Sequence, residues 1–179
     1  MIIDPTKQPF DSNHKLMIGS ILPRPIAFVS TKSKDGILNL APFSYFNGVC
    51  SNPPTVMFAP GRRGYDGLTK DTLNNIRDTE EFVVNIVSEQ IAEPMVACAT
   101  DFDKDVDEFE VSGLTPIDSV KVVPPRVKES KVSFECTLNT IVPVGEAGPG
   151  GGFVVIGTII MFHIDDEVYT DGQIGRAHV

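Results

Sequence analysis

A basic, glycine-rich loop leading into a short helix is the stretch whose residue types best suit ligand chemistry. Residues 61–72 read GRRGYDGLTKDT, and Asp71 or Thr69 is expected to cap a helix that continues to about residue 79. The cations of this loop are Arg62, Arg63 and Lys70. Free N–H groups at a helix start, beside cationic side chains, favour phosphate. The spacing is not that of a P-loop, and a solvated loop with surface cations is the alternative.

A second stretch, residues 39–47 (NLAPFSYFN), places three aromatic side chains, a serine and two asparagines around Pro42. Proline has no N–H to donate, so the strand is expected to stop pairing or to bulge near Pro42. Backbone groups and side chains there would become free for a ligand. The alternative, which composition favours, is a hydrophobic hairpin whose aromatic residues fill the core.

Other chemistry finds little support in the residue pattern. The G-x-S-x-G and H-E-x-x-H motifs are absent, and the histidines lie far apart. His163, late in an expected strand, is typical of a hydrogen-bonded rim residue. The acidic segment 101–110 begins like a calcium loop, but Val106 and Ser112 stand where an EF-hand needs Gly and Glu. A solvated acidic loop anchored by its two phenylalanines is the better interpretation.

Many short strands must position these stretches. A hairpin is expected from arms at 26–31 and 37–40, joined by a turn at 32–36 that ends in Asp-Gly. Further strands are expected at 55–59, 82–87, 132–144 and 153–164, with helical composition at 89–99, a surface arm at 1–16 and a C-terminal tail at 165–179. Few helices and frequent Pro and Gly breaks favour a closed antiparallel barrel with peripheral helices.

Length and charge narrow the class of protein. The 179 residues suit a single domain, and a net charge of -9 argues against nucleic acid and anionic membrane surfaces as partners. The start shows no secretory signal, and the longest apolar run, residues 153–162, is too short to span a bilayer as a helix. The three cysteines, Cys50, Cys98 and Cys136, lack metal-site or disulfide spacing. They are expected to be buried, reduced thiols in a cytoplasmic protein.

Taken in order, several motifs resemble the flavin reductase-like family over roughly residues 15–165. The motifs are RPIAFVST at 24–31, NLAPFSYF at 39–46, NPP at 52–54, KDTLNNI at 70–76, EFVVN at 81–85, DEFE at 107–110, GL at 113–114 and EC at 135–136, with Gly157 and His163. The resemblance implies a mainly β fold: an FMN-binding split, Greek-key antiparallel β-barrel with short peripheral helices. It also implies a homodimer with the flavin near the subunit interface.

The resemblance further implies a set of site residues. Those expected along the flavin cleft are Ser30, Thr31, Asn39, Ala41, Pro42, Phe43 and Ser44. Those expected at the phosphate are Lys70, Asp71 and Thr72, with Arg62 or Arg63 as helpers. His163 matches a family position near the nicotinamide, which makes it a candidate contact for NAD(P)H or substrate.

The implied reaction is hydride transfer from NADH or NADPH to FMN, held tightly or used as a substrate. Electrons would then pass to oxygen, a metal, free flavin or a partner protein such as a monooxygenase. A flavoredoxin-like electron carrier without efficient NAD(P)H turnover is the alternative, and a non-redox ligand-binding barrel is a third. Members of the family often continue beyond a tail that resembles residues 175–179. Whether the tail of this sequence contributes to the flavin site of the partner subunit is therefore a further question.

Overall fold

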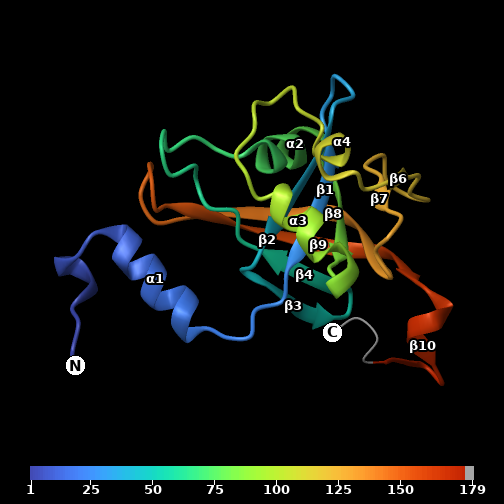
Figure 1. The fold of residues 1–179 in the computed structure, drawn as a ribbon, viewed down its shortest axis with the longest axis horizontal. Helices are drawn as coiled ribbons and strands as arrows, with labels where there is room; N and C mark the ends of the chain where they lie inside the picture. The colour runs from blue at the N-terminus through green and yellow to red at the C-terminus, as the bar shows by residue number, and fades with distance from the viewer. Residues whose placement is uncertain (176–179) are drawn as a thin grey trace.

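The computed structural model describes residues 1–175, and a seven-stranded antiparallel sheet forms its centre (Figure 1). The strands follow the order β2-β1-β5-β8-β9-β4-β3. Their bounds are β1 Ala27–Lys32, β2 Leu38–Phe43, β3 Phe46–Ser51, β4 Pro54–Phe58, β5 Glu81–Ile86, β8 Val132–Val144 and β9 Gly152–Ile164. Within residues 1–175, β2 and β3 are the edges of this sheet, and no ladder joins one edge to the other. The mainly β prediction is confirmed, whereas the hydrogen-bonded closure of a barrel stays a prediction.

Smaller elements surround the sheet. Two short ladders pair β6 Pro116–Ile117 with β7 Arg126–Val127, and β10 Tyr169–Thr170 with β11 Gln173–Ile174. The helices are α1 Phe10–Ser20, α2 Asp71–Thr79, α3 Ala92–Ala97 and α4 Glu108–Ser112, with 3-10 turns η1 Pro5–Lys7, η2 Glu89–Ile91 and η3 Asp166–Val168. No residue of η1 or α1 is buried, and α1 lies to one side of the sheet, away from the other helices (Figure 1). Residues 5–20 therefore have no buried residue in their helical parts, and the predicted arm is largely helical. The end of the predicted tail, residues 176–179, lies outside the described residues.

The opening hairpin forms as predicted, and pairing along β2 stops one residue after Pro42. Strand β2 pairs with β1 as far as Phe43, and Pro42 lies opposite Phe28 without a bulge. Because β2 is an edge strand, its outward N–H groups have no strand partner, and a proline at such a position removes no ladder bond. The N–H of Leu40, two residues earlier and on the same outer side, donates to the side chain of Glu108 at 3.0 Å.

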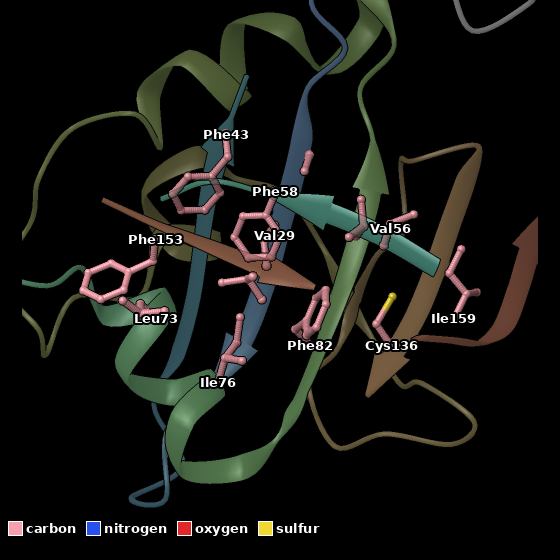
Figure 2. Packing of buried hydrophobic residues seen from close by; sticks show 13 residues of the cluster. Val29, Phe43, Val56, Phe58, Leu73, Ile76, Phe82, Cys136, Phe153 and Ile159 are labelled. Atoms are coloured by element: carbon pink, nitrogen blue, oxygen red, sulfur yellow. The ribbon is translucent and has the colours of Figure 1, made fainter. Parts of the chain in front are cut away.

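The two faces of the sheet bury different clusters. On one face Phe43, Phe58 and Phe82 form a row with ring centroids 5.0 and 5.6 Å apart, and Leu73 and Ile76 of α2 pack against them (Figure 2). The opposite face carries Phe28 and Leu40, which pack with Ile91, Met95 and Phe109 from η2, α3 and α4. Successive strand residues point to opposite faces, so the sheet separates α2 from α3 and α4. Phe43 therefore belongs to the core.

Helix α2 begins close to the expected position but without the expected cap. Lys70 occupies the N-cap and makes no side-chain cap hydrogen bond, while Asp71 is the first helical residue. The hydroxyl of Thr69 donates to Asn74 Oδ1 at 2.7 Å instead of accepting from the backbone. The helix start is thus left with N–H groups that no side chain caps.

The acidic segment is exposed at Asp101, Asp103 and Asp105 and anchored by Phe109, as predicted, but its last residues form the start of helix α4. Asp107 caps α4 by accepting the N–H of Phe109 at 2.8 Å, and both Glu108 and Phe109 are buried. The carboxylate of Glu108 serves as the acceptor that the edge strand β2 requires at Leu40. A tertiary hydrogen bond therefore draws one carboxyl of this run out of solvent.

The cysteine prediction is correct for two residues and wrong for the third. Cys98 and Cys136 are buried, and burial raises the pKa of both thiols, that of Cys98 to about 11. Cys50 is exposed because it lies on the edge strand β3. Among the described residues, no helix has the length and apolar character needed to cross a membrane.

Gly157 provides a test of packing between β9 and the core. A Cβ at this position would collide with the ring of Phe82 and lie 3.3 Å from the carbonyl oxygen of Thr137. Gly157→Ala should therefore lower the free energy of unfolding by about 1–3 kcal/mol, measured by urea denaturation. Gly19→Ala, in α1 with no atom within 4 Å of the new Cβ, is the matched control and should cause no loss. Equal losses in both variants would contradict the packing argument.

Candidate functional site

A pocket lies where the edge strand β2, the start of α2 and the segment between α3 and α4 meet. Its lining residues are Asn39, Ala41, Pro42, Arg63, Lys70, Asp71, Thr72, Cys98, Ala99, Thr100, Asp101, Phe102 and Glu108. Two stretches that are separate in the sequence, residues 39–42 and 70–72, therefore form two walls of one pocket. Six of the ten predicted cofactor residues lie here, and Arg63 joins them.

Side-chain hydrogen bonds hold α2 against the hairpin. Asn39 Nδ2 donates to the hydroxyl of Thr72 at 2.9 Å, and Asn75 Nδ2 donates to the hydroxyl of Thr31 at 3.0 Å. The Asn39–Thr72 bond is buried and the Asn75–Thr31 bond is half-buried, so both are shielded from water to some extent and tie the helix to β1 and β2. The pocket wall is consequently built on two anchored elements.

The cationic side of the pocket has two ion pairs. Lys70 Nζ lies 2.7 Å from Asp101 Oδ1, and an Arg63 Nη lies 2.7 Å from Asp71 Oδ2. Arg63 Nε is buried and, among the described residues, has no hydrogen-bond partner. An unsatisfied buried donor of a cationic side chain, next to an uncapped helix start, fits an oxyanion.

Glu108 supplies the carboxyl on the strand side of the pocket. Its side chain lines the cavity, and the residue is only 7 % exposed. Burial raises the pKa of Glu108 to about 7, against the lowering effect of the Leu40 N–H, and the charges of Asp107 and Asp71 raise it further. Sequence reasoning missed this residue, because its motif was interpreted as part of a solvated acidic run.

Four predicted cofactor residues do not line this pocket. Ser30 is buried, donates to the carbonyl oxygen of Pro125 at 2.5 Å and accepts from Asn85 at 3.2 Å. Thr31 contacts Asn75, and Phe43 lies in the core. The fourth, Ser44, accepts a 3.3 Å hydrogen bond from Arg24 Nε. These residues support the hairpin around the pocket, and their contact with a flavin stays a prediction.

The two helper arginines have different surroundings. The Arg62 guanidinium lies 4.9 Å from the ring centroid of Phe153 and donates to the carbonyl oxygen of Gly67 at 3.0 Å. It does not line the pocket, whereas Arg63 does. Of the pair, Arg63 is the residue placed to bind an anion.

His163 belongs to a different polar cluster. It lies on β9, which is four strands from β2 in the sheet order, and it is not in the pocket lining. His163 Nε2 lies 2.5 Å from Oε1 of Glu135, which is fully buried. The same carboxylate accepts the N–H groups of Val120, Lys121 and Val122, at 2.7, 2.6 and 3.2 Å.

Ionised Glu135 is stabilised by these donors. Burial would raise the pKa of Glu135, but the N–H of Val120 and the ring of His163, with the N–H of Lys121, hold it below its ordinary value. Glu135 thus fixes both His163 and the loop at 120–122. The sequence signal was weak, because Glu135 stood out only as part of a short motif.

Comparisons with known proteins identify the family of this chain and the fold that it shares with solved structures. Residues 18–177 match the model of the family described as the flavin reductase like domain. The chain is 38% identical to nitrilotriacetate monooxygenase component B from Bacillus cereus, with a TM-score of 0.92, covering 97% of this chain and 86% of that one. It is 32% identical to the 2-nitrobenzoate 2-nitroreductase NbaA of Pseudomonas fluorescens (TM-score 0.84, 99% and 83% covered). A split barrel domain protein from Shewanella frigidimarina is 27% identical (TM-score 0.80, 97% and 85% covered).

Proposed function

The chain belongs to the flavin reductase-like family, and we propose that it is an FMN-binding oxidoreductase that passes hydride from NAD(P)H to the flavin. The observation that carries the proposal is the pocket between the outer edge of β2 and the uncapped start of α2, lined by Arg63 and Lys70. A flavin mononucleotide has an apolar ring system with a polar edge and a phosphate dianion at its other end. The wall at residues 39–42 suits the ring system, and the wall with Arg63 and Lys70 suits the phosphate.

The phosphate would be held by Lys70, Arg63, Thr72 and the first N–H groups of α2. The unpartnered Arg63 Nε provides a donor for it. The ring would lie along the Asn39–Pro42 wall, where Ala41 is small and Pro42 lacks an N–H, so the strand edge can be approached closely. When bound, the flavin supplies the hydride-accepting chemistry, and the protein contributes binding and orientation.

Relatives suggest where the electrons go. One similar structure is component B of a nitrilotriacetate monooxygenase, and another is a nitroreductase. We propose that this protein likewise serves an electron acceptor, with a partner monooxygenase as the leading candidate. The proposal includes a homodimer of split barrels with the flavin near the interface. The exposed edge strand β3 offers unpaired backbone groups for such an interface.

The deciding experiment measures flavin reduction without oxygen. The purified protein is mixed with FMN under anaerobic conditions, and NADH or NADPH is then added. Rapid loss of the oxidised flavin's visible absorbance, much faster than with free FMN, is expected. Binding of FMN without accelerated bleaching would reject the reductase and leave an electron carrier, and no FMN binding would reject a flavoprotein altogether. Comparing the two donors fixes the nucleotide preference.

A further inference from the structure

Glu108 is the pocket carboxyl that has no cationic partner among residues 1–175. Lys70 pairs with Asp101 and Arg63 pairs with Asp71, at 2.7 Å in both cases. Oε2 of Glu108 accepts a 3.0 Å hydrogen bond from the N–H of Leu40. An amide N–H can donate to a neutral carboxyl as well as to a carboxylate. The bond therefore permits either protonation state.

The charged groups around Glu108 come from several neighbouring elements. The start of α2 contributes Lys70 and Asp71, the preceding loop Arg63, and the segment after α3 Asp101. Strand β2 contributes no titratable side chain to the pocket. The thiol of Cys98 also lines it, and burial raises its pKa to about 11, so that this thiol stays neutral near pH 7. On its own helix, Glu108 lies next to Asp107 and near the exposed Glu110.

The lining thus combines two cations, Arg63 and Lys70, with three carboxyl groups, Asp71, Asp101 and Glu108. A phosphate dianion adds two negative charges to a pocket whose cations are already paired. Repulsion between like charges is strong where water is excluded. It is relieved most easily by protonation of a carboxyl that no cation keeps ionised.

From this arrangement, and resting on the proposed function, we propose that Glu108 takes up a proton when the pocket binds the phosphate group of a flavin mononucleotide. Glu108 is then a specificity-determining residue. An ionised Glu108 weakens binding of the phosphate group, and a neutral Glu108 allows the phosphate group to bind. The pKa of about 7 supports the proposal, because protonation costs little near neutral pH. Affinity for FMN should therefore fall as pH rises above 7, approaching tenfold per pH unit.

Isothermal titration calorimetry at pH 8 tests the proposal directly. FMN binding is measured in two buffers that differ in ionisation enthalpy, which reports the number of protons taken up, independently of any turnover. The wild-type protein should take up between about half a proton and one proton per FMN. Riboflavin, which has the same ring but no phosphate, should bind without proton uptake. The phosphate itself is mostly dianionic at this pH, since its second pKa is about 6.

The variant Glu108→Gln keeps an acceptor for Leu40 and removes the titratable group. It should bind FMN without proton uptake and about tenfold more tightly than the wild type at pH 8. Glu110→Gln, an exposed position on the same helix, is the matched control and should behave as the wild type. If Glu108→Gln does not fold, as judged by circular dichroism, Glu108→Met supplies a neutral side chain of similar size.

The outcomes separate this inference from the proposed function. FMN binding without proton uptake, or uptake that persists in the neutral variants, overturns the role of Glu108 while leaving the flavoprotein intact. Equal uptake with riboflavin and FMN overturns the coupling to phosphate. Failure of FMN to bind at all overturns the proposed function, and this inference with it.

Discussion

Glu135→Gln should lower the free energy of unfolding by about 3 kcal/mol, the largest effect expected from a single polar substitution here. Glu135 is fully buried, and its two oxygens accept three backbone N–H groups besides contacting His163. A glutamine replaces one of these acceptor oxygens with a donor, so at least one backbone N–H of residues 120–122 would face another N–H. Urea denaturation at pH 7 measures the loss.

Glu81→Gln is the matched control for this substitution. Glu81 Oε2 accepts the N–H of Val123 at 2.8 Å, so it contacts the same loop, but through one exposed hydrogen bond. Its loss should be below about 1 kcal/mol. Similar losses in the two variants would show that burial of Glu135 contributes little.

The two buried glutamates should also give opposite pH dependences. The pKa of Glu135 is lowered, so its contribution to stability is present above the unfolded value, near 4.5, and is lost as pH falls through the folded value. The pKa of Glu108 is raised to about 7, so its contribution is present below 4.5 and is lost as pH rises through 7. Glu135→Gln should therefore reduce the change in the free energy of unfolding with pH below about pH 4.5. Glu108→Gln should reduce that change between pH 4.5 and 7.

Lys70→Ala should weaken FMN binding by about 10- to 100-fold, because a charge-assisted hydrogen bond to phosphate contributes about 1.5–3 kcal/mol. Equilibrium dialysis or flavin fluorescence titration measures the change. The fold should persist, because Lys70 is partly exposed and, within residues 1–175, makes one ion pair, with Asp101.

Lys34→Ala provides the control for Lys70. Lys34 also pairs with an aspartate, Asp78, at 3.6 Å, but this pair is exposed and outside the pocket. Its removal should leave FMN affinity unchanged. An unchanged affinity in Lys70→Ala as well would remove Lys70 from the phosphate site and direct attention to Arg63.

Much of the fold could be predicted because its signals are local. Alternating or continuous apolar residues, bounded by Pro, Gly or Asp-Gly, indicated β1, β2, β4, β5, β8 and β9 close to their observed bounds. The buried spacing of Leu73 and Ile76 indicated α2 in the same way. Local patterns indicated that pairing ends near Pro42, but they could not show that β2 is an edge strand, where Pro42 itself fits inside the ladder.

The candidate site could be predicted in part. The basic loop and the β2 segment were both identified, yet only the tertiary structure brings Asn39 and Thr72, 33 residues apart, into one hydrogen bond. It also separates residues that the sequence placed together: Ala41 and Pro42 line the pocket, whereas Phe43 packs in the core. Strand alternation decides which face of the sheet each side chain is on. Whether that side chain is buried depends on the elements that cover that face.

By itself, the sequence determined a mainly β chain with a basic loop before a short helix, and its ordered motifs were enough to indicate the family. These properties follow from neighbouring residues, whose backbone preferences and side-chain periodicity act over a few positions. The tertiary structure decided which carboxyl groups are buried. Glu108 meets Leu40 across 68 residues, and Glu135 meets a loop 13 to 15 residues away and His163 28 residues away. The carboxylate that accepts the free N–H groups of an edge strand or of the loop at 120–122 can be identified only in the folded chain, because it comes from a distant part of the sequence.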